Sequence, residues 1–222
     1  RRALLTPRTL GWLALSTALI AANWSVYVWA TTHHATLEAS LGYYVNPLLN
    51  MAAGAVLFRE RIDRWGKAAI ALAAVGVLIQ TAALGRPPWL SLILAFSFAG
   101  YGVIRKRVAA DAQTGLFIEC LLMLPFGLLL LTWLGAHGQA AGFQSPEQWL
   151  WALSSGPATV LPLALFAWSA RRLPLSTLGF IQFLAPTLQF GIGVMAGEPF
   201  TPLRALSFVF IWSGAAVFAL AA

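Results

Sequence analysis

The chain has 222 residues, of which 59% are hydrophobic and only 9% are charged, whereas an ordinary soluble domain has about 25% charged residues. This composition excludes a soluble globular protein and predicts an all-α integral membrane protein. The net charge of +7 does not indicate a nucleic-acid partner, because the basic residues stand in short clusters between apolar runs.

Eight apolar segments approach the roughly 20 residues that a helix needs to cross a hydrocarbon core about 30 Å thick. In chain order, these predicted spans cover residues 9–30, 37–58, 67–84, 88–104, 115–135, 148–170, 175–196 and 204–222. Most of the connections end in glycine, proline or charged residues. In the third span, Ala69 and Ala73 have the one-turn spacing that lets another helix backbone approach closely.

The basic residues between the spans are distributed unevenly. Twelve of them precede the first span or follow the second, fourth and sixth, whereas the other side has only Arg86 and Arg204. Short cytoplasmic loops of membrane proteins carry the excess of lysine and arginine. We therefore expect the twelve-charge side, and with it both ends of this chain, to be cytoplasmic.

Two segments of similar pattern indicate an internal repeat. Leu41 to Glu60 (LGYYVNPLLNMAAGAVLFRE) and Leu178 to Glu198 (LGFIQFLAPTLQFGIGVMAGE) each run Leu-Gly-aromatic, proline, an amide three residues later, then glycine and a final glutamate. They fall in the second and seventh spans, which are an odd number apart, so the two copies must cross the membrane in opposite directions. Inverted repeats of this kind build many secondary transporters.

The repeat also predicts how the chain is organised. Residues 1–84 form the remainder of a first repeat, residues 85–113 hold the fourth span and a basic cytoplasmic loop, and residues 114–222 complete the second repeat together with the fourth span. Pairing spans one to three with six to eight leaves the fourth and fifth without partners. We therefore expect ten spans in the intact protein, with two of them before residue 1.

Four segments resemble a known family. They are LEASLGYYVNPLLN (37–50), FSFAGYGVIRK (96–106), DAQTGLFIE (111–119) and RRLPLSTLGFIQFLAPTLQF (171–190), of which the last is the most specific. The whole chain is similar to the RarD branch of the EamA-type drug/metabolite transporters. The resemblance implies a bacterial inner-membrane permease of two inverted five-helix repeats, with the lipid bilayer and a small-molecule substrate as its partners.

A proline lies within a predicted span of each repeat, at positions 47 and 186. A proline inside a helix removes one backbone hydrogen bond and frees the carbonyl four residues earlier, here at Tyr43 and Gln182. A freed carbonyl in lipid costs several kcal/mol, so both turns must face protein or a water-filled cavity. We predict helix kinks at Pro47 and Pro186.

Polar side chains share a helical face with each proline, through spacings of three, four and seven residues. Interrupted helices at equivalent points of two repeats mark a transport site near the middle of the membrane. The predicted substrate-binding residues are Tyr43, Asn46, Asn50, Gln182 and Gln189, with Asn23 of the first span as a weaker candidate. The alternative is that these amides join helices through hydrogen bonds worth about 0.6–2 kcal/mol each.

Glu119 is the acid expected inside the bilayer, about one turn from the cytoplasmic end of the fifth span. An intramembrane carboxylate is a functional-site hypothesis by default, and Glu119 is our candidate for proton coupling. The alternative is an ion pair with Arg105 or Lys106. Glu60 and Glu198 end corresponding spans on opposite sides and are candidate gate or loop contacts, with a solvated helix end as the alternative.

Other reactive residues indicate no catalytic centre. Adjacent His33 and His34 would point about 100° apart on a helix and cannot form a facing metal pair. Ser154 and Ser155 lack the histidine and aspartate of a hydrolytic triad. The single Cys120 forms neither an intramolecular disulfide nor a Cys-based zinc site. We expect no metal, no cofactor and no enzymatic activity.

The sequence thus predicts a secondary-active permease that exports a small organic metabolite or drug-like molecule by alternating access, with a proton as the candidate coupling ion. The lack of a clearly central charge favours a neutral, zwitterionic or amphipathic cargo over an inorganic ion. The rival hypothesis is a non-transporting membrane scaffold or assembly protein. In a scaffold, leucine could replace the amides at little cost, whereas surface loops such as residues 59–67 would be essential.

Overall fold

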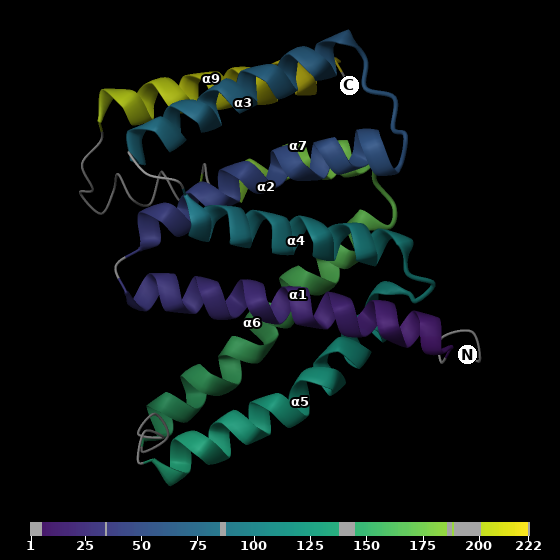
Figure 1. Ribbon diagram of the computed structural model, residues 1–222, viewed down its shortest axis with the longest axis vertical. Helices are drawn as coiled ribbons and strands as arrows, with labels where there is room; N and C mark the ends of the chain where they lie inside the picture. Colours follow the sequence, from purple (N-terminus) through teal and green to yellow (C-terminus); the bar gives the residue numbers. More distant parts are fainter. Residues whose placement is uncertain are drawn as a thin grey trace. The chain divides into compact units, whose positions relative to one another are not determined.

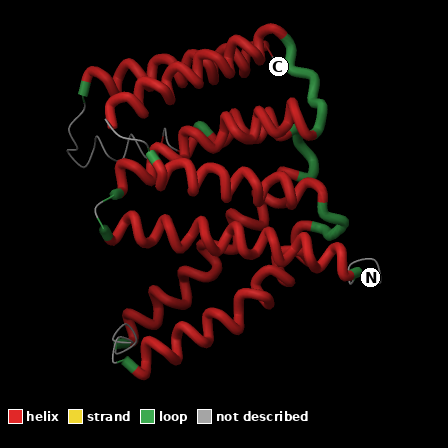
Figure 2. Tube along the Cα trace, viewed as in Figure 1, coloured by secondary structure: helices red, strands yellow, loops and turns green. Residues whose placement is uncertain are grey.

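The protein is described by a computed structural model in which the described residues are 6–33, 35–84, 88–137, 145–185, 188 and 201–221. Within these ranges the chain is helical, with short loops and turns and no strand (Figure 2). The helices are α1 (Pro7–Thr32), α2 (Thr36–Leu57), α3 (Arg64–Leu84), α4 (Trp89–Arg107), α5 (Ala112–Ala136), α6 (Pro146–Ala170), α7 (Leu175–Gln182) and α9 (Pro202–Ala221) (Figure 1). The all-α fold class is confirmed.

Seven of the predicted spans agree with a helix to within three residues at each end. The helices α1, α5 and α6 each have the length and apolar composition that a membrane crossing requires. In α5 and α6 most of the large apolar side chains are exposed, with Leu129 at 68% and Leu153 at 69%. Side chains of this kind suit contact with lipid, as in an integral membrane protein.

Of the seventh predicted span, residues 175–196, the structure describes residues 175–185 and 188. Helix α7 ends at Gln182, and the Phe183 N–H bonds the Phe180 carbonyl at 3.1 Å in a tightened last turn. Residues 184, 185 and 188 are helical again. By contrast, α2 continues through Pro47, which is fully buried. The predicted kink at Pro186 lies outside the described residues.

Contacts divide the chain into two compact units, each described by itself. The first holds residues up to 21 together with 104–172, and the second holds residues 22–103 and 173–222. The helices α1 and α4 therefore contribute to both. The boundaries differ from the division into 1–84, 85–113 and 114–222, which follows the inferred repeat and stays a prediction.

The second unit has its core where α2, α3, α7 and α9 meet. Helix α3 packs along α9, and α2 packs along both α7 and α3 (Figure 1). The buried core side chains are Leu41, Tyr44, Met51, Ala69, Ala73, Val77, Phe180, Phe183, Phe208 and Ile211.

Small residues let α3 and α9 approach closely. A Cβ atom added at Gly214 would lie 2.6 Å from the Ala69 carbonyl oxygen and 3.2 Å from the Ala73 nitrogen. Ala69 and Ala73 are themselves fully buried. The predicted close backbone approach at these two alanines is confirmed.

The first unit contains the α5–α6 pair and the cytoplasm-facing segments predicted around it. Asp111 caps the N-terminus of α5, and Ser145 with Gln148 forms a capping box at the start of α6. Leu13, Val108 and Ala110 form a small buried cluster. The contacts within this cluster join the beginning of α1 to the loop between α4 and α5.

Candidate functional site

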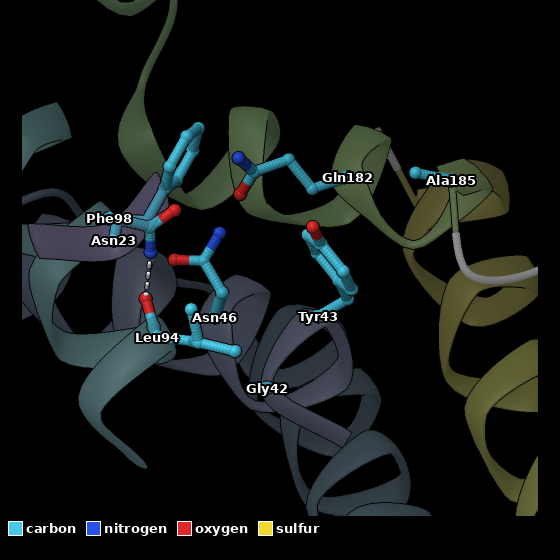
Figure 3. A pocket seen from close by; sticks show the side chains of 8 residues that line it. All are labelled: Asn23, Gly42, Tyr43, Asn46, Leu94, Phe98, Gln182 and Ala185. Atoms are coloured by element: carbon cyan, nitrogen blue, oxygen red, sulfur yellow. Dashed lines mark hydrogen bonds between the residues drawn. The ribbon is translucent and has the colours of Figure 1, made fainter. Parts of the chain in front are cut away.

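A cavity of about 180 Å³ lies within the second unit, among α1, α2, α4 and α7 (Figure 3). Its lining residues are Asn23, Gly42, Tyr43, Asn46, Leu94, Phe98, Gln182 and Ala185. Four of them, Asn23, Tyr43, Asn46 and Gln182, belong to the predicted substrate-binding set. None of these described lining residues carries a charge, so the cavity is suited to an uncharged group.

Gly42 allows the cavity walls formed by α2 and α4 to come together. A Cβ atom at Gly42 would lie 3.0 Å from the Ser91 carbonyl oxygen and 3.1 Å from Leu94 Cβ. One turn later, the same face of α2 carries Asn46. Gly42 and Asn46 both line the cavity.

Asn23 joins α1 to α4 at one side of the cavity. Its Nδ2 donates hydrogen bonds to the Leu94 carbonyl at 2.8 Å and to Ser97 Oγ at 2.9 Å. Both of its N–H donors are thus engaged within the protein, and Figure 3 shows the bond to Leu94. Asn23 combines a helix-joining role with a place in the cavity wall.

Asn46 is the most buried polar residue of the lining, with 7% of its side chain exposed. Its Oδ1 accepts no hydrogen bond from any described residue. Leaving a buried acceptor unsatisfied costs about 1–3 kcal/mol. A buried polar atom of this kind is typical of a binding site, where a ligand or water supplies the missing donor.

Asn50 and Gln182 join α2 to α7 beside the cavity. Asn50 Nδ2 donates a hydrogen bond to Gln182 Oε1 at 2.5 Å. Asn50 is fully buried, and its Oδ1 accepts no hydrogen bond from the described part of the chain. Asn50 is not among the lining residues, so its described contact is the helix-joining alternative rather than a direct contact with the cavity.

Tyr43 forms part of the cavity wall and is 37% exposed. Its ring packs edge to face against Tyr27, with the ring centroids 5.9 Å apart. The hydroxyl group points into the space that Gln182 and Asn46 also face (Figure 3). A tyrosine in this setting offers both an apolar ring and a hydrogen-bonding tip.

The helices α2 and α7 run in opposite directions and approach closely. Glu60, just after α2, contacts the beginning of α7, whereas Asn50 contacts its end. A Cβ atom at Gly179 would lie 2.6 Å from the Pro47 carbonyl oxygen and 2.9 Å from Met51 Cγ. This antiparallel pairing is what an inverted repeat requires, while the five-plus-five organisation stays a prediction.

Glu60 caps the N-terminus of α7 from the loop after α2. Its Oε1 accepts a hydrogen bond from the Leu175 N–H at 2.7 Å, and its Oε2 accepts bonds from the Ser176 N–H at 3.0 Å and Ser176 Oγ at 2.8 Å. The N-cap residue Pro174 provides no side-chain cap of its own. A carboxylate also interacts favourably with the positive end of a helix. A second cavity of about 350 Å³ lies at this contact, lined in part by Glu60 and Ser176.

The backbone before Glu60 is strained. Arg59 has a φ of 53°, in the left-handed region that residues other than glycine seldom adopt. The Glu60 N–H then bonds the Gly54 carbonyl at 3.1 Å, which turns the chain back towards α2. A Cβ atom at Gly54 would collide with the Glu60 carboxylate. Both features serve to place Glu60 beside α7.

Glu119 is buried in the first unit, with 3% exposed. Its Oε1 lies 3.6 Å from Nη1 of the fully buried Arg105 and accepts a hydrogen bond from Ser16 Oγ. Arg105 Nη2 also donates to the Ala112 carbonyl at 2.9 Å. A Cβ atom at Gly115 would overlap the Arg105 guanidinium. Of the two ion-pair partners that the sequence offered, the structure has Arg105.

The remaining predicted residues, Gln189, Pro186 and Glu198, lie outside the described residues. Sequence reasoning missed the apolar cavity residues Leu94, Phe98 and Ala185, because apolar side chains of the same kind also face lipid or pack in the core. It also missed Arg171, whose Nη1 donates to the Val108 carbonyl at 2.9 Å. In the sequence, Arg171 is only one of the basic residues that follow the sixth predicted span.

The helices define a multi-pass α-helical membrane protein, and the uncharged polar cavity is its candidate binding site. Three comparisons with known proteins agree with this class. An uncharacterized transporter of Pseudomonas aeruginosa is 44% identical over 209 residues, which cover 93% of this chain and 70% of that protein. RarD of Escherichia coli is 41% identical over 215 residues, 96% of this chain and 73% of that protein. RarD of Streptomyces exfoliatus is 40% identical over 215 residues, 96% of this chain and 68% of that protein.

The chain belongs to the RarD family of membrane transporters, as its sequence resemblance predicted. No family model matches the chain. A solved crystal structure shares the fold, with a TM-score of 0.68 and 22% sequence identity over all of this chain and 79% of that one.

Proposed function

We propose that this protein is a secondary-active permease that exports a small organic metabolite or drug-like molecule across the bacterial inner membrane by alternating access. The observation that carries the proposal is the cavity beside the antiparallel α2–α7 pair, lined by the uncharged polar side chains of Asn23, Tyr43, Asn46 and Gln182. A charged cargo would find no opposite charge among the described lining residues, and burying an unpaired charge is costly. The cargo is therefore neutral, zwitterionic or amphipathic.

The α2–α7 contact is the element that would change during transport. The basic-residue distribution predicts that both chain ends, and the loop holding Glu60, face the cytoplasm. On this orientation, the bonds from Leu175 and Ser176 to Glu60 hold the cytoplasmic ends of α2 and α7 together. Opening towards the cytoplasm requires Glu60 to release α7, which is the gate role that we propose for it. Glu198 keeps the matching role on the opposite side as a proposal from the sequence repeat.

Proton coupling through Glu119 is part of the same proposal. The Glu119 carboxylate forms an ion pair with Arg105 at 3.6 Å and accepts a hydrogen bond from Ser16 Oγ. Binding a proton would therefore require the Arg105 pair to separate during the cycle. Gln189 stays a proposed substrate contact from the repeat pattern alone.

The test is solute flux in liposomes that contain the complete protein. Neutral, zwitterionic and charged organic solutes would be compared in the parent and in the Asn46→Leu and Gln182→Leu variants. Ser155→Ala is the matched control, because that hydroxyl bonds only the Ala152 carbonyl of its own helix. Saturable flux that the two cavity variants lose and the control keeps supports the permease. Absence of saturable flux for every solute class would contradict it and favour the scaffold.

A further inference from the structure

The polar side chains around the cavity differ in which hydrogen-bonding groups they can offer to a cargo. Asn23 uses both N–H donors on Leu94 and Ser97, so its side chain has an accepting oxygen left to offer. Gln182 receives the Asn50 N–H on its carbonyl, so the group it can offer is its N–H₂. The walls therefore supply an acceptor on the α1 side and a donor on the α7 side.

Asn46 lies between these two groups and is the strongest single pointer to a ligand. It is 7% exposed, it lines the cavity, and its Oδ1 accepts no hydrogen bond from the described residues. Its amide group faces the same space as the Gln182 amide and the Tyr43 hydroxyl (Figure 3). An asparagine amide presents an acceptor and a donor side by side, which pairs with a planar edge that carries a donor beside an acceptor.

The size and electrostatics of the cavity further restrict which chemical group of a cargo can bind there. The volume of about 180 Å³ is below the roughly 300–1,000 Å³ of pockets that take drug-sized ligands, so the group that binds there is small. Leu94, Phe98 and Ala185 form apolar walls around the amides. A charged carboxylate or ammonium group would be desolvated there without a counter-charge. A compact, uncharged ring or short chain with one polar edge meets both conditions.

We infer that the cargo is recognised through a neutral planar edge that places an N–H donor beside a carbonyl acceptor, as in a carboxamide or a heterocyclic lactam. The N–H bonds Asn46 Oδ1, the carbonyl accepts from the Asn46 or Gln182 N–H₂, and the apolar part of the cargo lies against Leu94 and Phe98. This inference rests on the proposed transport function and specifies its substrate class.

The experiment compares probes that differ only in this edge. Thermal unfolding and equilibrium binding of the purified complete protein would be measured with benzamide, N,N-dimethylbenzamide and benzoate, and with uracil and 1,3-dimethyluracil. We expect at least one of the two N–H probes to bind the parent. We expect its N-methylated partner, and benzoate, to bind about tenfold more weakly or worse, because the buried acceptor is then left unpaired.

The Asn46 variants make the assignment specific. Asn46→Leu should lose the preference for the N–H probe, whereas Ser155→Ala should keep it. A variant that fails to fold would be recognised by its own unfolding transition, and Gln182→Leu then provides the second test on α7.

The inference would be overturned by binding that does not depend on the N–H donor of the probe. Equal affinity for methylated and unmethylated probes would do so, as would failure of both N–H probes to bind a parent protein that carries saturable flux of another solute. In either case the permease proposal would stand. Absence of saturable flux for every solute class would instead contradict the proposed function itself.

Discussion

Asn50 Nδ2 donates a hydrogen bond to Gln182 Oε1 at 2.5 Å, joining two helices at residues 132 positions apart in the chain. The bond lies on the face of α2 that also carries the buried Pro47 and the cavity residue Asn46. It fixes the Gln182 carbonyl and so directs the rest of that amide towards the cavity. One residue of the pair therefore positions the other.

This bond can be measured with a double-mutant cycle. Asn50→Leu and Gln182→Leu should each destabilise the protein, and the double variant should lose less than the sum. The expected coupling free energy is about 0.6–2 kcal/mol, the range of hydrogen bonds between membrane helices. Unfolding of the purified protein in mixed detergent provides the free energies. Additive losses would mean that the two side chains do not stabilise one another.

Gly179 should tolerate no side chain. A methyl group there meets the Pro47 carbonyl oxygen at 2.6 Å, so Gly179→Ala must push α2 and α7 apart and should cost about 1–3 kcal/mol. Gly127→Ala is the control, because no atom lies within 4 Å of its added Cβ. The control should be neutral or gain up to about 1 kcal/mol, since alanine favours a helix over glycine. Equal unfolding free energies for both variants would contradict the close α2–α7 contact.

Removing the Glu60 carboxylate should loosen the start of α7. Glu60→Ala leaves the Leu175 and Ser176 amides without their acceptor, and loss of a helix cap costs about 0.5–2 kcal/mol. Hydrogen exchange should accelerate at these two amides and much less in α6. Glu147→Ala, which removes an exposed carboxylate from the first turn of α6, is the control. Unchanged exchange at Leu175 and Ser176 in Glu60→Ala would show that the carboxylate does not cap α7.

The buried Arg105–Glu119 pair should respond asymmetrically to substitution. Arg105→Leu or Glu119→Leu alone leaves one charge buried without its partner and should cost about 3–5 kcal/mol. The double variant Arg105→Leu/Glu119→Leu should recover part of that loss, because no unpaired charge remains. The measurement is the unfolding free energy of the parent, the single variants and the double variant in detergent. A double variant as unstable as the sum of the singles would show that the two groups do not act as a pair.

Asp111 should make the first unit sensitive to acid. The Thr114 N–H bonds the Asp111 carboxylate at 2.8 Å and the Thr114 hydroxyl bonds it at 2.7 Å, and these bonds lower the pKa of Asp111 below its usual value. A lowered folded-state pKa adds stability above the unfolded-state pKa, and that stability is lost as the pH falls through the folded-state value. The stability difference between the parent and Asp111→Ala should therefore shrink on acidification. A difference that grows as the pH falls would contradict this assignment.

The positions of the helices were largely predictable because the bilayer imposes length and hydropathy on each span. Helix α7 ends at Gln182, within a predicted span whose hydropathy continues past that residue, and the sequence predicted an interruption only at position 186. Hydropathy measures transfer into lipid, whereas helix ends depend on backbone hydrogen bonds. Hydropathy therefore does not show where a helix ends within a predicted span.

Side-chain partners were less predictable, because they depend on contacts between distant segments. Glu60 and Leu175 are 115 positions apart, and nothing in either local sequence indicates the other. Helical spacing placed Asn46 and Asn50 on one face, but the structure divides them between the cavity and the α2–α7 contact. Adjacent Arg105 and Lys106 were equivalent candidates for Glu119 in the sequence, and the structure has the Arg105 guanidinium 3.6 Å from its carboxylate.

The most direct test of the account is whether the α2–α7 cavity is reached by water from both sides of the membrane. In a Cys120→Ala background, Ala185→Cys places a thiol in the cavity lining, and Leu129→Cys places one on an exposed apolar face of α5. Membrane-impermeant thiol reagents would be applied separately to each side of vesicles that contain the complete protein. Alternating access predicts that the thiol at position 185 is labelled from either side and the thiol at position 129 from neither. A position-185 thiol that reacts from one side only, or from neither, would contradict the account.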